Sequence, residues 1–385
     1  MRRHDLDWLR VLVFALLILY HVGMFFVPWG FHLKNNAIYE WLVYPMLFLN
    51  QWRLPILFVI SGMGTFYALQ KRTGAYFALE RIKRLGLPLI FGMLFIISPQ
   101  VYFERLNKNQ FVGSYFDFWP NEALNGIYPE GNFSWHHLWF LPYLLIFSLI
   151  LIPIFLHFKK HPNNKFILWI KEKSRKPLGL YTFVIPLYVA EAFIEPYFPI
   201  THALIDDWFN FINCMMLFLF GFLLMLIKDV FWITVEKYRS YFLITGILSF
   251  TIMLVIIHIY EDSTIRANFR PGVIDVERFE CHFTEAFIKV VNLWSWVLTL
   301  FGYSAKYLNR KSKILNYSNE AVYPFYILHQ TIMITIAYFL IELEWSFGSK
   351  FSIMTFGTFG FSWVIYEFLI RRWRFIRPLF GLKKK

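Results

Sequence analysis

Long apolar stretches separated by short polar connections run along almost the whole chain. A helix of about 20 apolar residues spans the hydrocarbon core of a bilayer, and the pattern predicts ten such segments. Their boundaries are 8–29, 40–69, 85–104, 136–158, 178–197, 206–227, 240–260, 283–304, 318–341 and 350–370. We therefore expect an all-α, polytopic membrane bundle of about ten transmembrane helices. Residues 1–385 should form a single membrane-embedded domain with no separate soluble domain, and the longest connections lie near 105–135 and 261–282.

The basic residues predict the orientation of these segments. With the N-terminus inside, 29 of the 38 Lys and Arg residues fall on the cytoplasmic side, as the positive-inside rule expects. Both termini are then cytoplasmic. The net charge of +13 is explained by this topology and by contact with anionic membrane lipids, and it does not indicate nucleic-acid binding. The first segment has no small-residue cleavage site, so we expect it to be retained as an anchor.

Composition excludes a soluble protein and a redox scaffold. Hydrophobic residues make up 58% of the chain and charged residues only 16%, which is typical of membrane proteins. The cysteines, Cys214 and Cys281, form neither a disulfide framework nor a metal-binding spacing. We therefore expect no metal.

The first segment carries two ionisable side chains on one face. Arg10 and His21 are eleven residues apart, which is within about 20° of three helical turns and about 16 Å along the axis. Arg10 is then at the inner rim and His21 near the middle of the membrane. Asp7 lies one turn before Arg10 and can pair with it. Because buried ionisable groups are costly in a bilayer, this polar track indicates a functional site.

Two further residues reach a similar depth. Arg53 lies about halfway through the second segment, and His329 of "YPFYILHQ" lies about eleven residues into the ninth. A common depth permits a common site with His21. The alternative for each residue is a hydrogen bond that packs two helices together.

A basic cluster marks the inner end of the third segment. "RIKR" places Arg81, Lys83 and Arg84 together, and guanidinium forks bind phosphate well. Ordinary positive-inside topology explains the same residues equally well.

Other motifs are less specific. "SWHHLWFLP" places His136 and His137 at the outer rim, and "FVISGMG" places Ser61 beside a glycine in the second segment. Paired histidines are unusual in an aromatic belt, so His136 and His137 are candidates for the acceptor side. A Ser-Gly pair lets helices or a ligand approach closely: helix packing is the favoured explanation for Ser61, and contact with the donor is the alternative. Four glutamates have structural explanations. Glu285 can pair with Lys289 one turn away, and water or snorkelling suffices for Glu191, Glu195 and Glu320 near segment ends.

These residues together predict two substrates that approach from opposite faces. The cytosolic one is anionic, and an acyl-CoA thioester fits because its phosphates can stay at the basic cluster while its slender arm enters the membrane. The acceptor is a hydroxyl from outside. His21 takes the hydroxyl proton as general base, and a cation such as Arg53 stabilises the oxyanion.

The chain resembles acyltransferase family 3, the integral membrane O-acyltransferases. The resemblance is carried by "LDWLR" followed after ten residues by His21, and by "FVISG", "RIKR", "HHLWFLP" and "YPFYILHQ" in this order. It extends in particular to the glucan succinyltransferases that modify osmoregulated periplasmic glucans. The resemblance implies a bacterial inner-membrane enzyme with a cytosolic acyl-CoA donor as co-substrate and an extracytoplasmic glycan acceptor. It also implies that Arg10 and His21 are essential, that His21 is the base, and that Arg81 and Arg84 hold the donor.

Several alternatives stay open. Intramembrane His and Arg also build proton relays in secondary transporters, although no half-to-half repeat of the transporter kind is visible. A lipid-binding scaffold would explain the basic loops but not His21 and His329. A covalent acyl-histidine competes with direct transfer. The acyl group (acetyl, succinyl or longer), the acceptor and the oligomeric state are undetermined by sequence.

Overall fold

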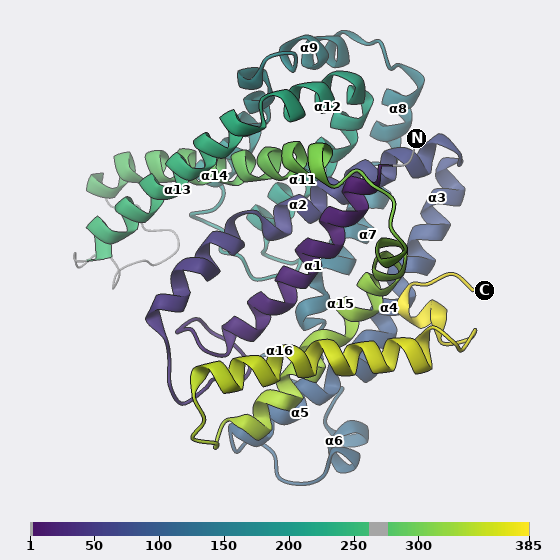
Figure 1. Ribbon diagram of the computed structural model, residues 1–385. Coiled ribbons are helices and arrows are strands. Elements are labelled where there is room, and N and C mark those ends of the chain that lie inside the picture. Colours follow the sequence, from purple (N-terminus) through teal and green to yellow (C-terminus); the bar gives the residue numbers. More distant parts are fainter. Residues whose placement is uncertain (1–2, 262–275, 385) are drawn as a thin grey trace. The chain divides into compact units, whose positions relative to one another are not determined.

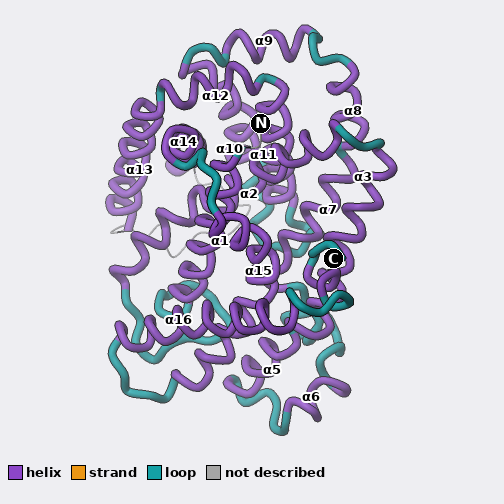
Figure 2. Tube along the Cα trace, turned by 45° about the vertical axis from the view of Figure 1, so that its right-hand side comes forward, coloured by secondary structure: helices purple, strands orange, loops and turns teal. Residues whose placement is uncertain are grey.

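The computed structural model describes residues 3–261 and 276–384, and side chains within 3–258 and 282–384. Most of the predicted connection near 261–282, and the side chain of Cys281, lie outside the described residues. Over the described ranges the regular structure is helical, apart from one isolated bridge between Ile127 and Phe133 (Figure 2). The predicted all-helical membrane architecture is confirmed.

Figure 1 labels most of the α-helices, and in the text η denotes a short 3₁₀ or π segment. In chain order they are α1 (His4–Met24), η1 (Glu40–Leu42), α2 (Val43–Gln70), α3 (Gly74–Arg81), η2 (Ile82–Gly86), α4 (Leu87–Phe91), η3 (Gly92–Ile96), α5 (Ser98–Asn107), α6 (Tyr115–Asn121), η4 (His136–Trp139), α7 (Phe140–Ile150), α8 (Ile152–Lys160), α9 (Lys165–Lys173), η5 (Pro177–Phe183), α10 (Val184–Phe193), α11 (Trp208–Leu226), α12 (Lys228–Lys237), α13 (Arg239–Glu261), α14 (Val276–Tyr307), α15 (Lys313–Leu340), α16 (Phe347–Val364), η7 (Ile365–Ile370) and η8 (Arg377–Phe380).

Eight helices within the described ranges are long and apolar enough to cross a membrane, and a bent pair would make nine. The eight are His4–Met24, Glu40–Gln70, Gly74–Asn107, Trp208–Leu226, Arg239–His258, His282–Tyr307, Lys313–Leu340 and Phe347–Ile370. The predicted segment 136–158 is the bent pair, with an angle of 47° between α7 and α8. Pro153 in the first turn of α8 lacks the N–H that a continuous helix would need. The predicted segment 178–197 is a shorter apolar helix, Pro177–Phe193.

The chain divides into two compact units that interleave along the sequence. The first unit contains Met1–Leu9, Asn50–Phe77 and Ile146–Lys311, and the second contains Arg10–Leu49, Ala78–Leu145 and Ser312–Lys385. Each unit is therefore assembled from discontinuous segments, and both contain long apolar helices.

In the first unit, glycines bring two helices into close contact. A Cβ at Gly62 of α2 would overlap the carbonyl oxygen of Phe218, and one at Gly221 of α11 would overlap that of Val59. The backbones can approach this closely only because both positions lack a side chain.

The same unit corrects one prediction about the glutamates. Glu191 of α10 is buried and forms an ion pair with Lys289 of α14, so the expectation that water solvates Glu191 is wrong. A buried carboxylate requires a cation, and the packing of α10 against α14 supplies it. Lys289, which we expected to pair along its own helix with Glu285, is thus also paired across helices.

In the second unit, α15 packs against α16 and α5. A cluster of buried apolar residues joins the end of α1 and the following loop to the last turns of α15 and to α16, including Phe25, Phe26, Met333, Ile334 and Met354. Toward the other end of α15, Glu320 forms a 2.7 Å ion pair with Arg377, so its charge is balanced by protein rather than by water alone. These contacts hold α15 between its neighbours and fix the side chains described below.

Candidate active site

Two histidines from different helices meet in the second unit. Nε2 of His329, on α15, lies 2.9 Å from Nδ1 of His21, which is three residues from the end of α1. Their ring centroids are 5.0 Å apart. His329 is fully buried and His21 is partly exposed. The predicted common depth therefore corresponds to a direct hydrogen bond.

A backbone carbonyl next to His329 determines which of the two rings donates the hydrogen bond between them. Nδ1 of His329 lies 2.8 Å from the carbonyl oxygen of Tyr326. A carbonyl only accepts, so Nδ1 of neutral His329 carries the proton and Nε2 carries the lone pair. His21 then donates its Nδ1–H to His329, and the lone pair of His21 is on Nε2. This is the tautomer that a general base needs when a second group orients it from behind.

Arg10 and Asn319 form a second connection between the same helices. Nη1 of Arg10 donates to Oδ1 of Asn319 over 3.1 Å. The two connections are eleven residues apart on α1 and ten apart on α15, or about 16 and 15 Å along the axes. The helices therefore run parallel and in register, and the polar track predicted for α1 faces α15.

His137 supports the histidine pair without offering a free ring nitrogen. Its Nε2 donates to the carbonyl of Ile327 over 3.1 Å, and its Nδ1 accepts from Gln100 over 3.4 Å. Its ring centroid lies 5.1 Å from that of His329. Tyr326 donates its hydroxyl to the carbonyl of His137 over 2.6 Å. His137 is thus held rigidly against the pair.

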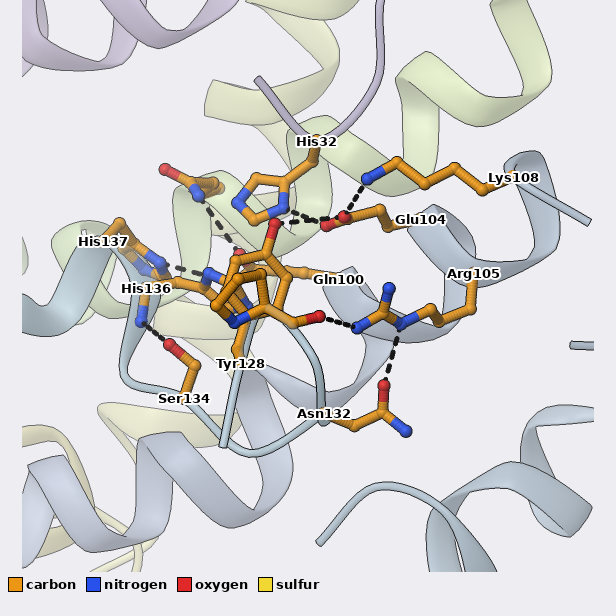
Figure 3. A network of polar contacts seen from close by, with 12 residues as sticks. His32, Gln100, Glu104, Arg105, Lys108, Tyr128, Asn132, Ser134, His136 and His137 are labelled. Carbon is orange, nitrogen blue, oxygen red and sulfur yellow. Dashed lines mark hydrogen bonds and ion pairs between the residues drawn. The ribbon is translucent and has the colours of Figure 1, made fainter. Parts of the chain in front are cut away.

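A second polar group lies beside this one, toward the side that the sequence predicts to be outside (Figure 3). At its centre Glu104, at the end of α5, is completely buried with 0% exposure. Its carboxylate accepts from Nδ1 of His32 and Nζ of Lys108, each at 2.5 Å, and from the hydroxyl of Tyr128 at 3.1 Å. Burial, together with the negative charge of Glu104, raises the pKa of Tyr128 to about 12, so this hydroxyl remains a donor at neutral pH.

Arg105, the neighbour of Glu104, holds the loop that follows. Its guanidinium donates to the carbonyls of Pro129 and Gly131 over 2.7 Å and to Oδ1 of Asn132 over 2.9 Å. Figure 3 shows Arg105 beside the loop that leads to His136 and His137. Two adjacent charged residues of α5, Glu104 and Arg105, therefore both bind residues 128–132 of this loop.

His136 packs against two of the residues that are bonded to Glu104. Its φ of 35° is unusual for a residue with a side chain, and its ring packs edge-on against His32 at 4.4 Å and Tyr128 at 4.6 Å between centroids. Its Nε2 is buried without a hydrogen-bond partner among the described residues. A nitrogen in this situation can receive a hydrogen bond from a ligand hydroxyl.

The predicted donor cluster lies at the opposite end of α15. Arg81 is partly exposed, and Lys83 and Arg84 are exposed. Tyr323 of α15 donates to the carbonyl of Arg84 over 3.0 Å, which ties the π segment η2 to α15. The three cations are accessible to a ligand.

Three predicted residues lie in the first unit. Arg53 and Asp7 are buried there, and Arg53 is close enough to His202 to act on its charge, although burial is the main reason that the pKa of His202 falls to about 4. Ser61 precedes the tightly packed Gly62, and its carbonyl accepts from Thr65. The Asp7–Arg10 pair, the oxyanion role of Arg53 and the donor role of Ser61 stay predictions.

The sequence interpretation missed the residues that hold the histidines in place. They are Gln100, Glu104, His32, Tyr128 and Tyr326. One signal was available, because Gln100, Glu104 and Lys108 recur every four residues at the end of the third segment and share one helix face. Across residues 3–258 and 282–384, no group of three or more His, Cys, Asp or Glu side chains is arranged to hold a metal ion.

Comparisons with known proteins agree with this architecture. Residues 3–367 match the family model described as Acyltransferase domain. Glucans biosynthesis protein C of Salmonella typhi and that of Salmonella typhimurium are each 27% identical to this chain over 238 residues, covering 58% of this chain and 57% of the relative. The protein of the same name from Salmonella paratyphi A is 26% identical over 166 residues, 42% of this chain and 41% of the relative. The matched region thus spans between 41% and 57% of the length of these relatives. No solved structure matches the chain. Because the family model covers nearly all of the sequence, this protein belongs to the acyltransferase domain family, that is, acyltransferase family 3.

Proposed function

We propose that this membrane acyltransferase moves an acyl group from cytosolic acyl-CoA to a hydroxyl of an extracytoplasmic glycan, with His21 as general base. The observation that carries the proposal is the 2.9 Å bond from His21 to His329. It orients the His21 ring and leaves the lone pair on Nε2. The parallel Arg10–Asn319 connection extends the same polar track toward the predicted cytoplasmic side.

The transfer proceeds by proton exchange at Nε2 of His21. The acceptor hydroxyl gives its proton to Nε2 while its oxygen attacks the thioester carbonyl carbon. The resulting imidazolium is stabilised because its Nδ1–H stays bonded to the lone pair of His329. When the tetrahedral intermediate collapses, the carbon–sulfur bond breaks, and the thiolate of CoA takes the proton back from His21. These steps balance in protons, bonds and electrons.

Each substrate has a set of side chains suited to its polar groups. Arg81, Lys83 and Arg84 are accessible cations for the phosphates of the donor. On the other side, His136 presents a buried, unpartnered nitrogen beside His32 and Tyr128, and such groups suit the hydroxyls of a sugar. The relatives are named for glucan biosynthesis, which supports a glucan as the acceptor. We further propose that the transferred acyl group is acetyl or succinyl. The enzyme lies in a bacterial inner membrane, and both of its termini are cytoplasmic.

Reconstituted vesicles test this function. The protein is inserted into liposomes with labelled acetyl-CoA or succinyl-CoA on one side and a periplasmic-type glucan on the other, and label on the glucan is measured. We expect transfer by the wild type and a loss of about 10²- to 10⁴-fold for His21→Ala. Transfer at the wild-type rate by a folded His21→Ala protein would refute the assignment of the base. Glucan or ion flux without acyl-CoA would instead indicate a transporter.

A further inference from the structure

Four hydroxyl groups line one face of the last membrane helix. Thr355, Thr358 and Ser362 on α16 and Tyr366 on η7 are spaced by three, four and four residues, which places them on a single helix face. Thr358, Ser362 and Tyr366 have 0% exposure. None of the four hydroxyl oxygens has a hydrogen-bond partner within the described parts of the chain. We name these four residues the hydroxyl row.

Several threonines elsewhere in the membrane helices are satisfied within their own helix. Thr65, Thr299 and Thr335 each donate to the carbonyl one turn earlier in their own helix, at distances of 2.7 to 3.0 Å. This is the usual way for a Ser or Thr side chain to be satisfied in lipid. Thr355, Thr358 and Ser362 do not make this bond. The hydroxyl of Tyr366, which is too far from its own backbone to make it, has no other partner within the described residues. Because an unmade hydrogen bond is costly inside a membrane, the row is arranged for a partner that the protein itself does not supply.

The contacts of α16 with α15 give the depth of the row. Tyr366 packs against Tyr317 and Phe325 at centroid distances of 5.6 and 6.2 Å. Phe359 lies 6.5 Å from Phe325, whereas a Cβ at Gly357 would meet Ile336. Residue 358 therefore lies between the levels of residues 325 and 336 on α15, an interval that contains His329. Figure 1 shows that α16 crosses α15.

Basic residues follow the other end of the row along the chain. Arg371 is bonded to Glu367, the neighbour of Tyr366, and Arg372 and Arg374 just beyond are exposed. A few residues later Gly381 lies against Tyr323, whose hydroxyl holds the carbonyl of Arg84. The predicted donor cluster and the end of the row are thus brought to the same part of the second unit.

We propose that the hydroxyl row binds the pantetheine arm of the acyl-CoA donor, an inference that rests on the proposed function. From Thr355 to Tyr366 the row extends about 16 Å, a length suited to an extended arm. The arm carries amide groups that must be hydrogen-bonded once they leave water, and hydroxyls can both donate to the amide carbonyls and accept from the amide N–H groups. With the phosphates at the arginines, the thioester would lie near Thr358, beside the part of α15 that contains His329.

Removing the hydroxyls without changing shape tests the inference. The triple variant Thr358→Val, Ser362→Ala, Tyr366→Phe should raise the KM for acyl-CoA, and the dissociation constant for CoA measured by calorimetry, at least tenfold, while kcat changes less than about twofold. Its thermal midpoint should equal or exceed that of the wild type, because it loses buried polar groups that have no partner. Ser352→Ala, at an exposed position of α16, is the matched control and should leave both constants unchanged.

The outcomes separate two failures. A triple variant that is stabilised but keeps the wild-type KM and dissociation constant would overturn the hydroxyl row as a donor site and leave the proposed function intact. A wild-type protein that neither binds CoA nor uses acyl-CoA would overturn the proposed function, and with it this inference.

Discussion

His21 and His329 are joined by a hydrogen bond of 2.9 Å, and the carbonyl of Tyr326 behind His329 makes His21 the donor. In the proposed mechanism the two neutral rings act together, with His21 as the base and its lone pair on Nε2. His329 would then play the orienting part that a carboxylate plays in hydrolase triads, but as a neutral acceptor, which avoids a buried negative charge in the membrane.

The orienting role of His329 predicts different outcomes for two substitutions. In His329→Gln the amide oxygen can still accept from Nδ1 of His21, whereas in His329→Leu nothing can. We expect kcat to fall less than tenfold for the first and about 10²-fold for the second, as measured by initial transfer rates at saturating donor. Equal losses in the two folded variants would contradict an orienting role.

The Arg10–Asn319 connection predicts energetic coupling between two helices. Arg10→Gln and Asn319→Leu should each lower kcat/KM, and the double variant should lose less than the sum, with a coupling energy of about 0.5–3 kcal/mol. Asn319→Asp, which keeps an acceptor for Arg10, should retain most of the activity. If the effects of the two single changes on kcat/KM were strictly additive, the 3.1 Å contact between Arg10 and Asn319 would not contribute to activity.

The buried carboxylate of Glu104 predicts a loss of stability when its charge is removed. Glu104→Gln removes the charge from the bonds to His32 and Lys108 and should destabilise the protein by about 2–3 kcal/mol, because charge-assisted bonds to a buried carboxylate are strong. Tyr128→Phe, which removes one neutral donor to the same group, should cost only about 1 kcal/mol. Unfolding followed by tryptophan fluorescence in detergent measures both. A smaller effect for Glu104→Gln than for Tyr128→Phe would contradict the central position of Glu104.

Glycine packing predicts a contrast within a single helix. Gly62→Ala forces a methyl group into the backbone of Phe218, whereas Gly64→Ala meets nothing within 4 Å. The first should destabilise the protein by about 1–3 kcal/mol and lower its yield, and the second should be neutral or slightly stabilising, since Ala is the better helix former. The comparison also tests Ser61-Gly62 as a packing motif, because a normal thermal midpoint for Gly62→Ala would remove that explanation.

The hydrophobic pattern of single segments predicted much of the membrane architecture. Apolar runs long enough to span a bilayer appear as helices at corresponding positions, since in lipid a helix satisfies its own backbone. The broken span at Leu151 was missed because hydropathy does not register the angle that Pro153 introduces. Similarly, Lys289 had a carboxylate one turn away in sequence, and only helix packing supplied Glu191 as a further partner.

By itself, the sequence determined that this chain crosses a membrane many times, that Arg10 and His21 share one face of the first helix, and that His329 reaches a similar depth. These follow from helical periodicity and from the cost of charge in hydrocarbon, which act within one segment. Tertiary structure alone decided that His329 accepts from His21 and that Glu104 bonds to His32, Lys108 and Tyr128. It also decided that the hydroxyl row has no hydrogen-bond partner within the described residues. Each of these depends on which helix faces become neighbours, and a hydrogen bond between distant segments leaves no periodic trace in the chain.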